Sequence, residues 1–380
     1  MRSILIAHQS SIPHYRIPFY NALENLRPNK WRFEVVIPRS EINQKKYFKD
    51  DLNSGDFLFP TLNVNTYSWN IGSRTLGYQT FWLEAGNYDL IIVEDAINNL
   101  TYPLCHIHKL SGTQIAYWGL GRDRKVDKHS PLTYLVNQLK LFLNQKANGY
   151  FAYTEGVKNH LISQGIPEDK IFTVNNTIDI SQHRTSFQNA TNRRESIRRD
   201  LGVSKKNVLL FVSTFKKAKR ADFLLNAFSF LQEKNNKFHL LLVGSGGEAY
   251  LEKSSENITY FGSVVEIQKL APIYVASDIF AYPGQVGLAP LQALCYDLPV
   301  ITIDSHFNHG PEIEYLTPEN SIILDQSTSP EEYARAITDL FQDNKRLQLL
   351  KSNTWPSIRH LTIEQMANNF IGGINLILEQ

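Results

Sequence analysis

The chain lacks the features that mark secreted, metal-binding or nucleic-acid-binding proteins. Its 380 residues include only two cysteines, Cys105 and Cys295, whose separation suggests neither a disulfide framework nor a metal motif. The formal net charge is +2, because 39 basic residues nearly balance 37 acidic ones. Overall charge therefore gives no reason to expect a nucleic-acid partner. Few cysteines also fit a reducing cytosol.

Long apolar runs are missing as well. No stretch reaches the 18 or more apolar residues that a membrane-spanning helix needs. The run at 4–7 near the N-terminus is shorter than the core of a signal peptide and predicts a first β-strand. We therefore expect a cytoplasmic protein, either soluble or peripherally bound to a membrane.

The sequence does contain a regular alternation of short apolar runs with segments of helical periodicity. Continuous apolar runs are typical of parallel strands that are covered on both faces. They lie at 4–7, 33–37, 90–93, 115–118, 150–153 and 172–174, and again at 208–212, 240–243, 279–282, 300–302 and 322–324. This pattern predicts an α/β protein with two doubly wound domains.

A polar stretch without strand character, residues 181–206, separates the two halves. We predict an N-terminal Rossmann-like domain at 1–182 and a C-terminal one at 183–360. The last helix, 361–380, is expected to pack back on the first domain. Two such domains would bind ligands at the carboxyl ends of their strands, across a cleft.

Basic residues follow the strand predicted at 208–212. Lys216, Lys217, Lys219 and Arg220 lie between this strand and the next helical segment. Positive charge here would stabilise a diphosphate leaving group as its negative charge develops. On its own, such a cluster is more often a solvated loop.

The segment from Tyr282 to Thr302 combines a strand, a glycine-bearing turn, a helix and a second strand. This arrangement points the free N–H groups of a helix N-terminus toward an anion above a parallel sheet. Gly287 allows the backbone to approach such a ligand without a Cβ in the way.

Several segments within residues 147–325 resemble, in the same order, motifs of the retaining family 4 glycosyltransferases of GT-B fold. The matching segments are Ser213-Thr-Phe followed three residues later by Lys219-Arg220, the glycine turn at 242–247, the loop at 260–264, Val286-Gly-Leu288 and His309-Gly-Pro-Glu312. The resemblance implies two Rossmann-like domains that face each other across a cleft. It also implies a donor site for a nucleotide-diphosphate sugar in the second domain.

The resemblance implies roles for individual residues of this donor site. Lys219 would bind the phosphates, and Glu312 would orient a sugar hydroxyl unless it only interacts with a helix dipole. The remaining implied donor contacts are Thr214, Gly262, the backbone amides of Val286, Gly287 and Leu288, and Gln292.

The chain departs from the family at several of these positions. Gly284 and Gln292 stand where the family has two glutamates, so a sugar contact is lost and a ribose contact becomes uncharged. The loss of charge at Gln292 would weaken the hydrogen bond to the ribose by about 1 kcal/mol. Thr214 replaces an arginine, and Leu120 stands where one branch has a histidine. These changes leave open a non-catalytic GT-B protein that binds a nucleotide sugar or glycan as a scaffold or subunit.

Candidate acceptor-side residues lie in two loops of the first domain. His14 and Arg16 come between the first strand and the first helix, and are acceptor-binding candidates. Glu94 and Asp95 follow the strand at 90–93, and Asp95 is our candidate for a base. Residues in such loops are more often ordinary solvated side chains, and that alternative stays open for all four.

A basic loop at 122–128 precedes a helix whose apolar residues on one side are Leu132, Leu135, Val136, Leu139 and Leu143. Such a pair of segments is able to contact an anionic membrane surface. Core packing explains the same apolar stripe, and it is the interpretation we favour.

No Asp-x-Asp pair follows a predicted strand, and no histidine or cysteine spacing matches a metal site. We therefore expect catalysis without metal or cofactor. The resemblance implies a retaining hexosyltransferase of polysaccharide biosynthesis, with a glycan or lipid-linked saccharide as acceptor. A sugar-nucleotide epimerase of the same fold would need a cluster of acids that the sequence does not show.

Overall fold

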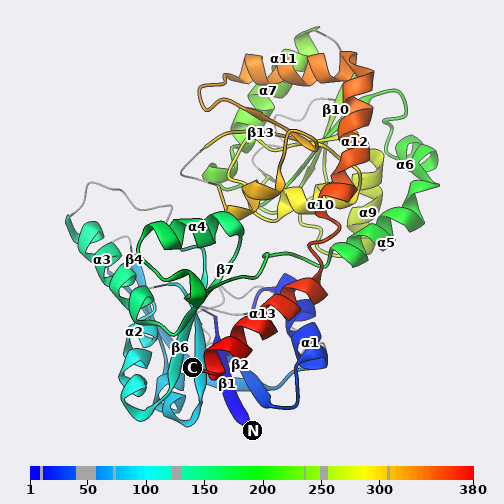
Figure 1. Cartoon of the computed structure of the whole chain (residues 1–380). Helices are drawn as coiled ribbons and strands as arrows, with labels where there is room; N and C mark the ends of the chain where they lie inside the picture. Colours follow the sequence, from blue (N-terminus) through cyan, green and yellow to red (C-terminus); the bar gives the residue numbers. More distant parts are fainter. Residues whose placement is uncertain are drawn as a thin grey trace. The chain divides into compact units, whose positions relative to one another are not determined.

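The computed structural model describes two compact units of the chain (Figure 1). The described residues are 1–8, 12–39, 57–71, 74–96, 98–121, 131–234, 237–248, 256–305 and 309–380. Unit 1 comprises Met1–Ile178 and Ile363–Gln380, and unit 2 comprises Asp179–Thr362. The basic loop at 122–128 lies outside the described residues.

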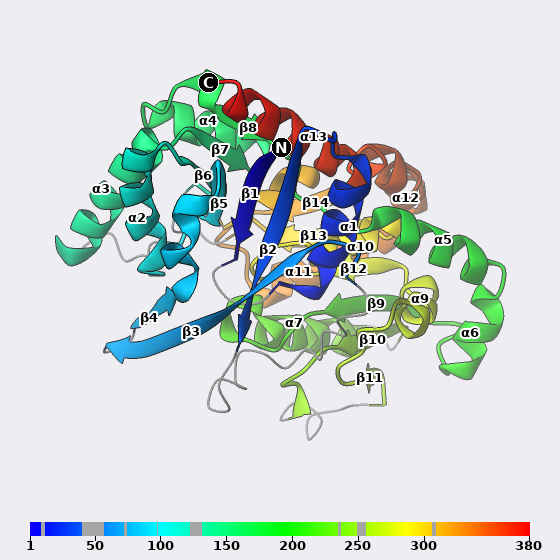
Figure 2. The same cartoon turned by 90° about the horizontal axis from the view of Figure 1, so that it is seen from below.

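Unit 1 is built on an eight-stranded sheet with the order β4-β3-β2-β1-β5-β6-β7-β8. Its strands are β1 (Arg2–Ala7), β2 (Trp31–Arg39), β3 (Thr61–Ile71), β4 (Arg74–Gln79), β5 (Leu90–Glu94), β6 (Gln114–Gly119), β7 (Gly149–Ala152) and β8 (Ile171–Thr173). Neighbouring strands are parallel except β3 and β4, which form an antiparallel hairpin at one edge (Figure 2). The strand order reverses at β1, which pairs with β2 on one side and β5 on the other.

The apolar runs predicted in the first half all lie in parallel strands, and the β3–β4 hairpin was not predicted. The hairpin alternates polar and apolar residues, which is typical of an antiparallel pair with one face exposed. Tyr67 and Trp69, for example, stay about half exposed on β3.

Helices cover both faces of the unit 1 sheet. One face packs against α1 (Ile17–Leu26) and α13 (Ile363–Leu378), which lie side by side. The other face packs against α2 (Thr101–Cys105), α3 (Pro131–Lys146) and α4 (Glu155–Ser163). Close approach of α13 to the sheet requires Gly373, because a Cβ there would lie 2.5 Å from Phe151.

Helix α3 exposes four apolar side chains, of which we expected Leu135 and Leu139 in the core. Tyr134, Leu135, Leu139 and Phe142 are 48 to 63% exposed, and Leu143 is the member of the expected stripe that is buried. Core packing was therefore the wrong explanation for Leu135 and Leu139. No helix among the described residues is long and apolar enough to cross a membrane.

Unit 2 is built on a six-stranded parallel sheet with the order β11-β10-β9-β12-β13-β14. Its strands are β9 (Asn207–Val212), β10 (Phe238–Val243), β11 (Ile258–Tyr260), β12 (Ile279–Ala281), β13 (Val300–Ile303) and β14 (Ser321–Leu324). The order reverses between β9 and β12, as in doubly wound nucleotide-binding domains. The short β11 is the strand of this unit that the sequence did not predict.

The polar stretch at 181–206, which separates the two predicted domains, is largely helical and belongs to unit 2. This stretch forms α5 (Ile180–Thr191) and α6 (Arg194–Asp200), which both pack against α9 (Ile267–Ala276). The other helices are α7 (Ala221–Lys234), α10 (Ala289–Cys295), α11 (Pro330–Gln342) and α12 (Asn344–Ile358). Ser329 and Glu332 form the predicted capping box at the start of α11.

Asp278, directly before β12, holds a buried cluster of cations together. Its carboxylate lies 2.6 Å from Arg194, 3.3 Å from Arg198 and 3.5 Å from Lys351. Burial disfavours its ionised form, but these cations hold its pKa below the usual range. Arg198 is 5% exposed and also donates to the carbonyl oxygens of Val203 at 3.1 Å and Ala276 at 2.6 Å. Its guanidinium is therefore well supplied with acceptors.

Candidate functional site

The loops that follow β9 and β12 meet at the carboxyl edge of unit 2. Lys219 Nζ donates to the carbonyl oxygen of Gln285 at 2.6 Å, and the Gln285 amide donates to Ala218 at 2.8 Å. The ring of Tyr282 lies 5.6 Å from the same Nζ. Open α/β sheets bind ligands at the carboxyl ends of strands where the strand order reverses. Lys219 therefore lies where this fold binds ligands.

Gly284 allows this contact because it has no Cβ. A Cβ at this position would overlap the carbonyl group of Lys219 and lie 2.5 Å from its Cα. The glutamate that the resembled family has here does not fit unless the Lys219 segment moves. Arg220 has φ 53°, in the left-handed region that favours glycine, the residue the family has at its position.

His309 organises the turn at Val286, and sequence analysis gave it no role. The Val286 amide donates to His309 Nδ1 at 3.0 Å, and the Gly310 amide donates to the Val286 carbonyl at 2.7 Å. The other ring nitrogen, Nε2, lies 2.9 Å from the Ile303 carbonyl oxygen and 3.0 Å from the Ser305 amide nitrogen.

This contact corrects our expectation that the Val286 amide faces a donor phosphate, because that amide already has a partner. Within the described residues, the amides of Gly287 and Leu288 make no hydrogen bond. A Cβ built on Gly287 would meet open space. These two amides thus remain candidates for binding an anion.

Glu312 is brought to the same turn. It lies in the 3-10 helix Pro311–Tyr315 and is buried. Its carboxylate folds back over Gly310, where a Cβ would overlap Oε2 and would lie 3.4 Å from the Cα of Gly287. The structure therefore places Glu312 beside Gly287.

The loops after β9, β10 and β11 are joined through their backbones. The Gly244 amide donates to the Gly262 carbonyl at 2.7 Å, and a Cβ on Gly244 would overlap the Ser213 carbonyl group. Gly262 has φ 70°. Thr214 follows Ser213 and is exposed, so its side chain is accessible at this edge.

Gln292 lies on α10 and already has one partner. Its Oε1 accepts a hydrogen bond from the buried hydroxyl of Tyr274 at 3.1 Å. An amide oxygen has two lone pairs, so one stays available for a second donor. The contact fixes the side chain that we expected at a ribose.

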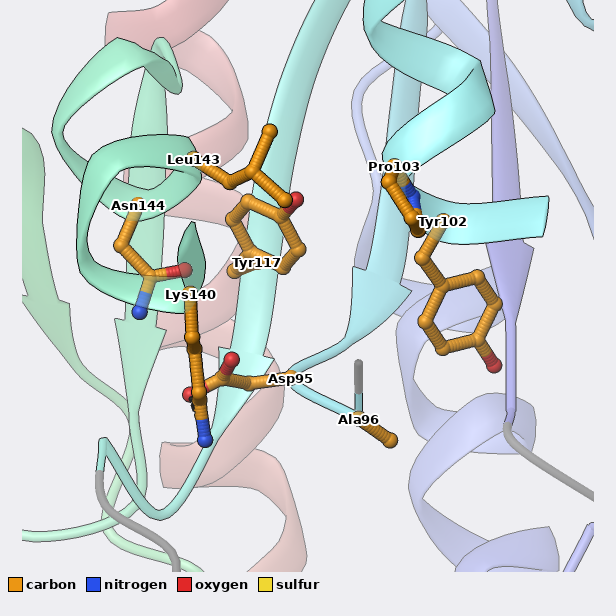
Figure 3. Close-up of a pocket in the computed structure, with 8 residues that line it drawn as sticks. All are labelled: Asp95, Ala96, Tyr102, Pro103, Tyr117, Lys140, Leu143 and Asn144. Atoms are coloured by element: carbon orange, nitrogen blue, oxygen red, sulfur yellow. Dashed lines mark ion pairs between the residues drawn. The ribbon is translucent and has the colours of Figure 1, made fainter. Parts of the chain in front are cut away.

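Asp95 follows β5 and lies in a small pocket with Lys140, Asn144 and Tyr117 (Figure 3). Its Oδ2 lies 3.1 Å from Lys140 Nζ and accepts from the Tyr150 hydroxyl at 2.5 Å. Burial, with the charge of Asp95 beside it, raises the pKa of Tyr150 well above its usual range. The carboxylate is 3% exposed, so it is held in an ion pair rather than presented to solvent.

The two candidates in the first loop of unit 1 have different environments. His14 is exposed, whereas Arg16 is 1% exposed. The guanidinium carbon of Arg16 lies 4.6 Å from the ring centroid of Trp118, with Tyr15 and Tyr153 at 5.2 and 5.4 Å. The structure therefore does not bring His14 and Arg16 together as one exposed site.

Other groups that bear on a cofactor or a base are few. Glu94 Oε1 lies 3.4 Å from Nδ1 of the buried His8, a residue that sequence analysis did not single out. Among the described residues, no three His, Cys, Asp or Glu side chains gather as they would around a metal ion.

Residues 206–343 match the family model described as glycosyl transferases group 1. Spore coat protein SA of Bacillus subtilis is 26% identical over 198 residues, which are 48% of this chain and 52% of that protein. An uncharacterized 41.2 kDa protein in the cps region of Klebsiella pneumoniae is 28% identical over 161 residues, 41% of each chain. The chain thus spans about half the length of the curated relatives it matches.

Solved structures resemble the chain over its whole length. Anabaena HepE in complex with UDP has a TM-score of 0.70 at 14% identity, covering 99% of this chain and 100% of that one. A glycosyltransferase from Rickettsia africae has a TM-score of 0.68 at 16% identity, covering 100% and 99%. TarM has a TM-score of 0.66 at 12% identity, covering 99% of both chains. The chain therefore has the GT-B fold, with two Rossmann-like α/β units.

Proposed function

We propose that this chain is a glycosyltransferase that moves a hexose from a nucleotide-diphosphate sugar to a glycan or lipid-linked saccharide. The GT-B fold and the match of residues 206–343 to a glycosyltransferase model support the proposal. The single observation that carries it is the contact between the Lys219 loop and the Gly284–Leu288 turn at the β9–β12 reversal. This is the place where a doubly wound sheet binds a nucleotide.

The proposed chemistry follows from the charges at this edge. As the sugar leaves, negative charge develops on the diphosphate, and the Lys219 ammonium with the Gly287 and Leu288 amides would stabilise it. Gln285 and Tyr282 hold the ammonium in place. Glu312, beside Gly287, would bind a sugar hydroxyl. In this proposal a side-chain cation supplies the charge that a metal supplies elsewhere.

The relatives suggest which substrates to test first. Solved complexes of HepE contain UDP and UDP-glucose, which makes UDP-sugars the first donors to try. The relatives from a spore coat and a cps region support a saccharide acceptor of polysaccharide biosynthesis. In this proposal the chain is a cytoplasmic, retaining enzyme of family 4. NMR of the product would test retention by identifying the anomeric configuration of the transferred sugar.

A second candidate function is a GT-B protein that binds a nucleotide sugar or glycan without turning it over. The fit at Gly284 favours it, because the position leaves no room for the side chain that would hold the transferred sugar. The contact of Gln292 with Tyr274 points the same way, because it occupies part of the expected ribose acceptor.

Hydrolysis of donor without acceptor separates the two functions. We expect slow release of nucleoside diphosphate from one member of a sugar-nucleotide panel. Lys219→Ala should lower the rate by about 100-fold or more, because it removes the charge that stabilises the leaving group. Lys205→Ala, which removes an exposed lysine of the same unit, is the charge-matched control and should leave the rate unchanged. If donors raise the melting temperature but none is turned over, even with cell glycans, the binding function stands.

A further inference from the structure

The buried guanidinium of Arg16 has no acidic partner among the described residues. Its Nη1 contacts the sulfur of Met366 on α13 at 3.6 Å, and its Nη2 has no hydrogen-bond partner. A guanidinium stays charged at any pH that a folded protein meets. The chain thus buries a full positive charge next to a thioether and three aromatic rings, and the Tyr153 hydroxyl is its uncharged hydrogen-bond partner.

The aromatic rings offset only part of the free-energy cost of burying this charge. A cation over an aromatic face gains about 1 to 2 kcal/mol when both are desolvated. Burying an ion without a counter-ion costs several kcal/mol, and an unmade hydrogen bond adds about 1 to 3 kcal/mol. Buried polar groups in folded proteins nearly always have partners, so a lone donor indicates a missing acceptor.

The position of Arg16 in the fold indicates what kind of acceptor is missing. Trp118, His8 and Glu94 lie at the carboxyl ends of β6, β1 and β5, and the Trp118 ring lies 5.5 Å from that of His8. The strand order of unit 1 reverses between β1 and β5. Arg16 therefore lies over the place where a sheet of this type binds its ligand.

Two buried donors of the cluster have no acceptor. The indole Nε1 of Trp118 is buried and, like Arg16 Nη2, has no hydrogen-bond partner. Both groups only donate. Glu94 contacts His8 at 3.4 Å and makes no ion pair with Arg16, so it does not neutralise the guanidinium. The ligand that fits must bring oxygen acceptors and negative charge.

We propose that the β1–β5 reversal of unit 1 binds an oxyanion, a phosphate or a carboxylate, through Arg16 Nη2 and Trp118 Nε1. Tyr15, which is 41% exposed, contacts Arg16, so the cluster lies close to the surface. Assigning the oxyanion to the acceptor rests on the proposed function, whereas the binding itself does not. The acceptor is then an acidic saccharide or a saccharide phosphate.

Anion-dependent melting of the whole chain tests the proposal. Inorganic phosphate and glucuronate are compared with chloride at equal ionic strength, so that the two arms separate the phosphate from the carboxylate. One of them should raise the melting temperature by about 2 to 4 °C at saturation. The rise should vanish in Arg16→Met and persist in Lys219→Ala. If Lys219→Ala alone abolishes it, the anion binds at the donor edge and the proposal is wrong.

A second readout compares Arg16 with Arg198. Arg198 is equally buried but has oxygen acceptors from Asp278, Ala276 and Val203, so Arg198→Met should melt several degrees lower. Without added anion, Arg16→Met should melt at the wild-type temperature or above, because it removes a buried charge that has no counter-ion.

Two outcomes decide what Arg16 does. If Arg16→Met destabilises as much as Arg198→Met and no anion shifts the wild type, Arg16 is a structural cation held by its rings. Should Arg16→Met not fold, Trp118→Phe keeps the ring and removes only Nε1. The proposal then requires a smaller anion shift in Trp118→Phe, and an unchanged shift overturns it.

Discussion

The strand order reverses once in each sheet, and the loops at one reversal meet through different chemical groups from those at the other. In unit 2 the loops meet through backbone: Gly284 lies against Lys219, and Gly244 lies against Ser213. In unit 1 they meet through buried side chains, among them His8, Arg16 and Trp118. A backbone contact survives most side-chain changes, whereas a side-chain cluster changes with each substitution.

This difference fits what the comparisons show. The family model matches residues 206–343, which lie wholly in unit 2. A site made from main-chain groups suits a ligand part common to many donors, such as a diphosphate. A site made from side chains suits an acceptor that differs from one protein to the next. Three predictions would break or sharpen this contrast.

The largest effect is expected at Asp95 in unit 1. Asp95→Ala should lower the free energy of unfolding by about 3 kcal/mol, because Lys140 and the Tyr150 hydroxyl lose their buried acceptor. Asp95→Asn keeps an acceptor for Tyr150 and should cost less. Urea unfolding measures both. An unchanged urea midpoint for Asp95→Ala together with lost sugar transfer would instead make Asp95 the acceptor-side base.

A smaller effect is expected where unit 2 depends on backbone contact. Gly284→Ala should lower the free energy of unfolding by about 1 to 3 kcal/mol, because the methyl group overlaps Lys219. Gly287→Ala is the matched control for stability, since its methyl group would meet open space. Thermal unfolding compares the two variants. Equal stability of both would show that the loops do not depend on this contact.

The smallest effect concerns acid. Burial lowers the pKa of His183 in unit 2 to about 4. The unfolded chain titrates near its usual value of about 6.5, so it binds more protons than the folded one between these values. Stability should be constant above this window, and His183 should contribute about 1 kcal/mol to its fall from pH 7 to about pH 5.5. The pKa values of His106 and His239 are also lowered to about 4, so His183→Asn should reduce the fall measured in urea without abolishing it, whereas the exposed His360→Asn should leave it unchanged.

The sequence predicted the features of the fold that depend on local pattern. Parallel strands covered on both faces are continuous apolar runs, and these were found. The β3–β4 hairpin was missed because its polar residues are interspersed with apolar ones. The stripe on α3 was recognised, but periodicity says only that a helix has an apolar face. It does not say whether a neighbour covers residues such as Leu135.

Residues of the site were predictable only where the spacing of a motif identified them. Lys219 and Gly284 were singled out from their places in motifs, but their contact joins residues far apart in sequence. The role of His309 depends on a hydrogen bond to Val286 that no local pattern encodes. Arg16 was expected in an exposed loop, and its burial depends on Met366, 350 positions along the chain.

The packing of α13 has a consequence for the order in which the chain matures. Segment 363–380 belongs to unit 1 but is synthesised after all of unit 2. Until it emerges from the ribosome, Trp118 and Phe151 lack the ring of Phe370 that covers them. Unit 2 is free to fold while unit 1 is still incomplete, although unit 1 begins the chain. A nascent chain stalled before residue 363 would therefore present to chaperones a sheet face that α1 alone covers.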